Sequence, residues 1–178
     1  MVIEIRKPNI EILTPEGIPE DFAQVMKYFN EALKIKRYTF IPRKTPITIE
    51  EIKNLWVPSI DKNISYVADL NGTIIGSATP FFNVNSTAYE HAAERKPGEI
   101  GLTVKPPYSH GAIGKKLLQT IINELKNTGK TAFLHTDIHW GEEIDMMASL
   151  GYMGTLIENY ERYKKAGLCG KVREYKLP

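Results

Sequence analysis

A run of small residues from Gly111 to Gly114 stands directly before a long amphipathic stretch. At the start of a helix several backbone N–H groups have no helical carbonyl to bind, and small side chains leave these donors accessible. The donors and the positive end of the helix dipole attract an anion, and Lys115 and Lys116 add positive charge beside them. The pattern predicts a phosphate or pyrophosphate site. The alternative is that the small residues serve close packing of the helix on a strand.

Two common phosphate-binding motifs fit this run badly. A P-loop requires GxxxxGK[ST], but Ser109 stands at the first glycine position and Lys116 at the Ser/Thr position. The dinucleotide motif GxGxxG is absent, and its βαβ unit usually begins the domain. The sequence therefore indicates a phosphate ligand that is held in another way.

A second group of residues able to do chemistry consists of His135, Asp137 and His139. They alternate along an apolar run, so on one continuous strand all three would point to the same face. There they could hold a divalent metal, relay protons, recognise an acceptor or make ordinary surface hydrogen bonds. Because the third ligand would be only an aspartate, we assign no residue to a metal. A metal-dependent enzyme built on HTDIH stays as a separate hypothesis.

Composition narrows the class of protein. The chain has 178 residues, 42% of them hydrophobic, which is enough for one domain spanning residues 1–178 with a sizeable core. A net charge of +2 argues against nucleic acid or an anionic membrane as the main partner. The single cysteine, Cys169, cannot form an intrachain disulfide, and no apolar run approaches the length of a membrane span. We therefore expect a soluble protein of the reducing cytoplasm.

The elements that must position these residues follow from periodicity and turn signals. Asn71-Gly72 between two β-branched runs predicts a hairpin, and Thr48 with Glu51 predicts a capping box. A strand, the long helix after Gly111 and a second strand make a parallel βαβ unit. The order of elements predicts an α/β fold, in which a central mixed (α+β) sheet has helices on both faces. Strands are predicted at 3–12 (a break at Pro8 is left open), 64–70, 73–84, 99–104, 131–138 and 172–177, helices at 19–33, 48–58, 111–128 and 142–150, and surface connections at 35–47 and 85–97.

The stretch VKPPYSHGAIGKKLL, residues 104–118, resembles the coenzyme A loop of the GNAT acyltransferases. In that family a strand ending in valine precedes a proline, then [RQ]xxGx[GA], then a leucine-rich helix. Here Ser109 replaces the Arg or Gln and Ala112 replaces the first glycine, but the main-chain donors remain. Leu150-Gly151-Tyr152 resembles the LGF or LGY that ends the family's fourth helix, and nearly the whole chain follows its order of elements. The resemblance implies cofactor contacts at Ser109, His110, Gly111, Ala112, Ile113, Gly114 and Lys115.

The same resemblance implies a GNAT-like acyl-CoA N-acyltransferase fold and the function of an N-acetyltransferase. Acetyl-CoA would be the cosubstrate, and an amine of a small molecule or a peptide would attack it directly in a ternary complex. In that family the strand before the loop lies along the pantetheine arm, so Leu102, Thr103 and Val104 would contact the cofactor through the backbone. The alternative is a non-catalytic acyl-CoA-binding protein of the same fold. A homodimer is left open.

Glu99 is the candidate catalytic base. An amine with a pKa of about 10.4 is almost entirely protonated at neutral pH, so the transfer needs a proton acceptor, and some family members place a glutamate near this point. The alternative for Glu99 is a solvated carboxylate at a strand end. The family's usual acid is a tyrosine four residues before the glycine of LGF, but Met147 stands there and cannot donate a proton. Three tyrosines could replace it or serve only as packed aromatics: Tyr152, Tyr160 and Tyr163.

Overall fold

Seven described strands form one mixed sheet in the order β1-β2-β3-β4-β5-β7-β6. The computed structural model describes residues 2–34, 45–61, 63–83, 96–106, 108, 111–165 and 168–178. The strands are β1 (Glu4–Arg6), β2 (Tyr66–Leu70), β3 (Thr73–Phe81), β4 (Glu99–Val104), β5 (Ala132–Asp137), β6 (Thr155–Ile157) and β7 (Val172–Leu177). The helices are α1 (Glu20–Lys34), α2 (Ile49–Glu51), α3 (Val57–Ser59), α4 (Ala112–Thr128), α5 (Gly141–Ser149) and α6 (Glu161–Lys165). Most of the two predicted surface connections, at 35–44 and 85–95, lies outside the described residues, as does residue 84 at the end of a predicted strand.

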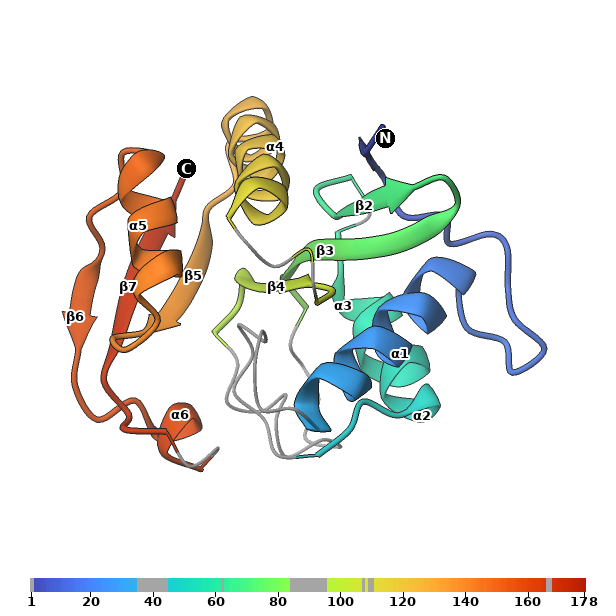
Figure 1. The fold of residues 1–178 in the computed structure, drawn as a ribbon, viewed down its shortest axis with the longest axis horizontal. Helices are drawn as coiled ribbons and strands as arrows, with labels where there is room; N and C mark the ends of the chain where they lie inside the picture. The colour runs from blue at the N-terminus through green and yellow to red at the C-terminus, as the bar shows by residue number, and fades with distance from the viewer. Residues whose placement is uncertain are drawn as a thin grey trace.

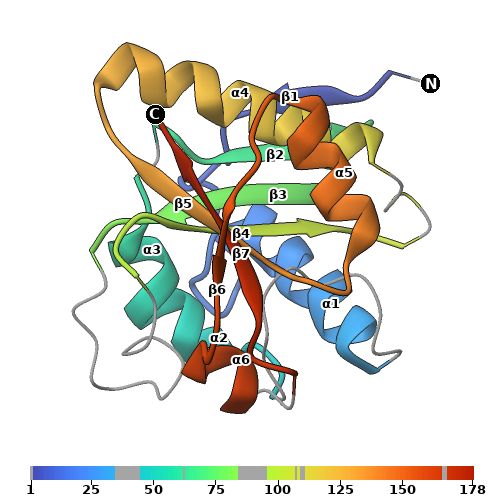
Figure 2. The same ribbon diagram turned by 90° about the vertical axis from the view of Figure 1, so that its left-hand side faces the viewer.

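The pairing of the strands confirms the predicted mixed sheet. β1 to β4 are antiparallel neighbours, β4 is parallel to β5, and β5, β7 and β6 are again antiparallel. α4 connects β4 to β5, which confirms the parallel βαβ unit. α4 and α5 lie on one side of the sheet and α1 to α3 on the other (Figures 1 and 2). The sheet therefore has helices on both faces, as predicted.

Two apolar cores hold these layers together. The period of α4 places one buried stripe against the sheet and α5, and its members are Ile113, Leu117, Leu118, Ile121, Ile122 and Leu125. On the opposite face, α1 buries Phe22, Val25 and Phe29 with residues of the α2–α3 segment. The side chain of Trp56 lies between Phe22 and Phe81, with edge-to-face contacts to both rings. The apolar periodicity of each helix thus fixes which of its faces meets the sheet.

Local signals in the sequence are confirmed where they are strongest. Asn71 and Gly72 both have positive φ, at 53° and 85°, as a two-residue hairpin turn between β2 and β3 requires. Thr48 accepts a hydrogen bond from the backbone N–H of Glu51 at 3.1 Å, which begins the short helix. A π-helical segment, Ile52–Trp56, continues that helix into α3. Gly129 ends α4 in the left-handed conformation.

β4 and β5 diverge soon after they meet. β4 pairs with β3 along its whole length, from Glu99↔Phe81 to Val104↔Gly76. With β5 it has a single registered pair, Glu99↔Phe133. β5 instead pairs along its whole length with β7 (Figure 1). The sheet therefore opens between β4 and β5 on the side where α4 begins.

Three predictions on the fold need correction. The first strand stops before Pro8, as the sequence allowed, but it does not resume toward residue 12. β1 ends at Arg6, because Pro8 has no N–H to donate and Asn9 Oδ1 accepts from the N–H groups of Glu11 and Ile12 instead. The sequence did not predict β6 or α6, which have three and five residues and little apolar pattern. The strands predicted to run through residues 84 and 138 end at Phe81 and Asp137. No helix in the described part of the chain is long and apolar enough to span a membrane.

Candidate active site

The start of α4 is an accessible set of backbone donors. Gly111 is its N-cap, with φ of 61° and no side-chain capping bond, and a Cβ there would meet nothing within 4 Å. A cavity of about 420 Å³ adjoins it, with Gly111, Ala112 and Lys115 on one wall. The other wall comes from α5: Glu142, Asp145, Met146 and Ser149. Because the α5 wall carries carboxylates, an anion fits this cavity only on the α4 side.

The small residues of this turn divide into two kinds. Gly114 is buried, and a Cβ there would lie 3.4 Å from Met146 Sδ and 3.9 Å from the side chains of Leu102 and Val104. Its lack of a side chain lets α4 pack closely on β4 and α5. Ile113 is also buried in that core, so only its backbone can face a ligand. The packing interpretation is therefore confirmed at Gly114, while the anion site at Gly111, where a Cβ would meet nothing within 4 Å, stays a prediction. The expected contacts at Ser109 and His110 lie outside the described residues.

The backbone of β4 offers two N–H groups toward the opening in the sheet. The N–H of Lys105 donates to the carbonyl of Ile75 at 2.7 Å, so by the register Thr103 and Gly101 also exchange backbone bonds with β3. At the start of the strand the N–H of Glu99 donates instead to the carbonyl of Lys96 at 2.9 Å. Because Leu102 and Val104 alternate with the residues that bond β3, their N–H groups point toward β5. Among the described residues they have no strand partner there, because the registered pairing ends at Glu99. Thr103 turns its N–H toward β3, and its hydroxyl lies 2.7 Å from that of Tyr28.

A buried polar cluster lies on the α1 side of the same strands. Glu99 is 4% exposed, so it is not the solvated strand-end carboxylate that the sequence also allowed. Its Oε1 lies 3.7 Å from Nδ1 of His135. Nε2 of His135 lies 2.9 Å from Oε2 of Glu174, the residue directly opposite on β7. Lys96 Nζ also donates to Oε2 of Glu174, at 2.8 Å. The backbone N–H of Lys96 donates to Glu99 Oε2 at 3.3 Å.

The charges of this cluster stabilise one another. Burial alone would raise the pKa of Glu174, but hydrogen bonds from Lys96 and His135 outweigh it and lower that pKa. Glu174 is therefore held ionised next to the imidazole of His135. In the described part of the chain, Nδ1 of His135 is buried and has no hydrogen-bond partner, and Glu99 is the carboxylate that it faces. The ring is thus fixed at one nitrogen and directed toward the candidate base by the other.

Two tyrosines form the wall beside His135. The ring of Tyr160 stacks on the imidazole with centroids 4.6 Å apart, and its hydroxyl lies 3.5 Å from Glu99 Oε2. Tyr163 is fully buried and donates to the backbone carbonyl of His135 at 2.9 Å. Of the three tyrosines that could replace the missing acid, Tyr160 has its hydroxyl beside the candidate base in the described part of the chain. Met147 is fully buried in the core under α4.

The predicted common face of His135, Asp137 and His139 is wrong for His139. β5 ends at Asp137, and His139 lies in the following turn, where its N–H donates to Asp137 Oδ1 at 2.9 Å. Asp137 lies close to Cys169, with 3.7 Å between Oδ2 and Sγ. The alternation of His135, Asp137 and His139 in the sequence continues past the end of β5. It therefore does not show that all three side chains lie on one face. His135 joins the cluster of Glu99, and the other two residues belong to a separate group.

The sequence missed two members of the buried cluster, Lys96 and Glu174. Glu174 reaches His135 because β7 pairs with β5 in one particular register, across a sequence separation of 39 residues. Lys96 reaches Glu174 across 78 residues. No local pattern announces such pairs. The sequence offered only charged residues within the two predicted strands, Glu99 in one and Arg173, Glu174 and Lys176 in the other, while Lys96 lay in a predicted connection.

Comparisons with known proteins agree with this architecture. Residues 28–152 match the model of the acetyltransferase (GNAT) family. A ribosomal-protein-alanine N-acetyltransferase from Brucella melitensis is 17% identical, with a TM-score of 0.67 over 97% of this chain and 98% of that chain. The NatC complex bound to Gag peptide and CoA contains a chain that is 18% identical, with a TM-score of 0.66 over 100% and 99%. The acetyltransferase candidate yncA from Salmonella typhimurium, solved with its cofactor acetyl-CoA, is 14% identical, with a TM-score of 0.64 over 99% and 94%. No curated protein matches the sequence.

Proposed function

This chain belongs to the acetyltransferase (GNAT) family, and from that premise we propose that it transfers the acetyl group of acetyl-CoA to an amine by direct attack. The observation that carries the proposal is that β4 has both hydrogen-bond donors and a buried carboxylate along its length. Two of its backbone N–H groups, at Leu102 and Val104, point into the opening beside β5. The same strand begins with the buried carboxylate of Glu99. One strand thus supplies donors for a carbonyl oxygen and an acceptor for a proton.

The cofactor would be held by the backbone at the start of α4. Acetyl-CoA supplies an activated acyl group on a thioester, together with a diphosphate that anchors it. Gly111 and Ala112 offer accessible N–H groups at the positive end of a helix of 17 residues, and Lys115 adds charge on the same wall of the cavity. The Salmonella neighbour was solved with its cofactor acetyl-CoA, which supports acetyl-CoA as the cosubstrate. Ser109, His110, Ile113 and Gly114 complete the expected contacts, with Ile113 and Gly114 limited to their backbone.

The amine must lose a proton before it can attack, and Glu99 is the proposed acceptor. The proton would pass from the ammonium nitrogen to a carboxylate oxygen of Glu99, directly or through a water. His135 and Lys96 position that carboxylate, and Glu174 fixes His135 in turn. The N–H groups of Leu102 or Val104 would stabilise the negative charge that develops on the acyl oxygen. Because Met147 cannot act as an acid, another donor or water must protonate the leaving thiolate.

The acceptor class follows less directly from the site. The neighbours include an enzyme named for a ribosomal-protein alanine and a complex bound to a peptide, which supports a peptide N-terminus as one acceptor to test. A small amine is the other. Both meet the same requirement, because each is protonated in solution and must reach Glu99.

The experiment that tests the function measures binding and turnover separately. Calorimetry gives the affinity for acetyl-CoA, and release of the CoA thiol is followed with a panel of small amines and peptides. We expect binding and amine-dependent thiol release. Binding without turnover on any amine would favour the alternative, a non-catalytic acyl-CoA-binding protein. No binding at millimolar acetyl-CoA would remove both.

A further inference from the structure

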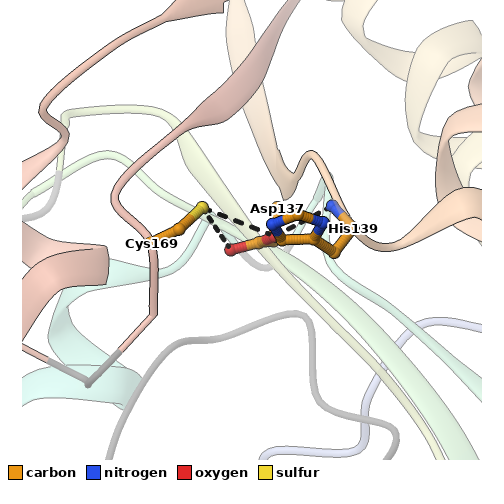
Figure 3. A group of neighbouring side chains, drawn as sticks. All are labelled: Asp137, His139 and Cys169. Atoms are coloured by element: carbon orange, nitrogen blue, oxygen red, sulfur yellow. Dashed lines mark hydrogen bonds between the residues drawn. The ribbon is translucent and has the colours of Figure 1, made fainter.

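Asp137, His139 and Cys169 form a compact group of side chains outside the proposed catalytic cluster (Figure 3). Each offers one ligand atom, and these atoms all lie within 4.8 Å of one another. Asp137 ends β5, His139 lies in the turn after it, and Cys169 comes from the segment before β7. A carboxylate, an imidazole and a thiol thus converge from two parts of the chain.

The burial of Asp137 distinguishes this group from a cluster of surface residues. The Asp137 side chain is 2% exposed, yet among the described residues no cationic side chain lies within ion-pair distance of it. Oδ1 accepts a hydrogen bond from the N–H of His139 at 2.9 Å. Among the described residues, the hydrogen-bond neighbour of Oδ2 is the thiol of Cys169 at 3.7 Å, and that thiol also lies 4.0 Å from Oδ1. A buried carboxylate without a cation is costly, and a bound metal ion would offset that cost.

The distances suit a shared ion. In tetrahedral zinc sites the bonds to sulfur are about 2.3 Å and those to nitrogen or oxygen about 2.0 Å, so neighbouring ligand atoms lie about 3.5 Å apart. The separation of 3.7 Å between Cys169 Sγ and Asp137 Oδ2 is close to that value. The N–H of Lys171 points at Sγ from 3.4 Å, a bond that stabilises a thiolate. His139 is exposed, so its ring is free to turn toward the ion.

We propose that Asp137, His139 and Cys169 bind one Zn²⁺ ion, or a cation of similar chemistry, with a fourth position open to solvent or a ligand. The thiolate and imidazole favour zinc over Mg²⁺ or Ca²⁺, which prefer oxygen ligands. This departs from the sequence interpretation, which assigned no metal and did not consider Cys169. The ion would tie the end of β5 to the segment before β7, which follows directly after α6 and its Tyr163.

The test uses the full chain without an affinity tag and without acetyl-CoA. Titration with Co²⁺ reports a thiolate ligand through its near-ultraviolet charge-transfer band, and equilibrium dialysis gives the stoichiometry for Zn²⁺. We expect one ion per chain and a Co²⁺–thiolate band. Cys169→Ser and His139→Gln alter exposed residues, and each is expected to weaken Zn²⁺ binding by about tenfold or more. Glu161→Gln, an exposed carboxylate on α6, is the matched control and should bind as the parent does.

A second measurement keeps the result independent of affinity. Cys169 is the only cysteine, so reaction of the chain with a thiol reagent reports this side chain alone. Saturating Zn²⁺ should slow that reaction severalfold in the parent and not in His139→Gln. Absence of a thiolate band with Co²⁺, or equal Zn²⁺ binding by Cys169→Ser, would overturn the proposal, since a histidine elsewhere would then hold the ion. Acetyl transfer is not measured, so failure here says nothing about the proposed function.

Discussion

The two faces of β4 differ in almost every physical respect although they belong to the same six residues. On the α4 side, Ile100, Leu102 and Val104 join a wholly apolar core. On the α1 side, Glu99 and Thr103 are equally buried but polar, and both have hydrogen-bond partners. The alternation of a strand therefore gives its two faces different roles. The apolar face (Ile100, Leu102 and Val104), here called the supporting face, fixes where the strand lies. The polar face (Glu99 and Thr103), here called the chemical face, carries the groups that can move a proton.

The largest effect is expected from Glu99→Gln, which tests the chemical face. Glutamine keeps the shape but cannot accept a proton, so we expect kcat/KM for acetyl transfer to fall by about 10²–10⁴-fold. The affinity for acetyl-CoA should stay unchanged in calorimetry, because the carboxylate does not lie at the start of α4. Glu158→Gln, an exposed carboxylate, is the control for charge. Activity within twofold of the parent would show that Glu99 is only structural.

The supporting face is tested by Leu117→Ala. Leu117 is fully buried on α4, close enough to Gly76 that a Cβ there would lie 3.2 Å from its Cδ1. Removing its side chain should lower the free energy of unfolding by about 2–5 kcal/mol, measured by urea denaturation. Gln119→Ala on the exposed side of the same helix should change it by less than about 0.5 kcal/mol. Equal losses for the two variants would mean that this core does not hold α4 in place.

The supporting face was also the one that the sequence could predict. The spacing from Ile113 to Leu125 shows the buried stripe of α4 directly, and Gly129 marks its end, because helix periodicity and left-handed caps are local properties. The Asn71-Gly72 hairpin is local in the same way. Each of these depends on residues within a few positions of one another, so one sequence contains the whole signal.

The chemical face could be predicted only in part. The sequence singled out Glu99 as a candidate base, which stays a prediction, but its neighbours His135 and Glu174 come from strands whose pairing is a long-range property. A shift of one residue in the register of β7 would turn Glu174 to the other face. The grouping of Asp137 with Cys169 was missed for the same reason. The sequence therefore showed which residues could do chemistry but not which of them meet.

The third prediction concerns the pH dependence of stability that buried Tyr28 causes at the chemical face of β4. Burial raises the pKa of Tyr28 from 10.0 to about 12, although hydrogen bonds with Ser77 and Thr103 act in the opposite direction. A raised pKa in the folded state means that stability is intact below pH 10 and is lost as the pH rises toward 12. We expect the parent to lose about 2–3 kcal/mol over that interval beyond the loss in Tyr28→Phe. Parallel stability curves from pH 10 to 12 would contradict a dry site at Thr103.

The smallest expected effect is a loss of acetyl-CoA affinity at one end of α4. It distinguishes Gly111, which is proposed to bind the cofactor, from Gly129, which only caps the helix. Gly111 and Gly129 have similar positive φ, 61° and 66°, and a Cβ at either would meet nothing within 4 Å. Their ψ values differ, however: Gly129 has ψ of 16° in the left-handed region, whereas Gly111 has ψ of −49° outside it. Alanine should therefore cost about 1–2 kcal/mol in the free energy of unfolding at Gly129, and more at Gly111. Only Gly111 borders the cavity at the helix start, so only Gly111→Ala should weaken acetyl-CoA binding, by about tenfold or 1.4 kcal/mol in calorimetry. If Gly129→Ala weakens binding as much, the loss comes from general strain in α4. The donors at its first turn would then not be the anion site.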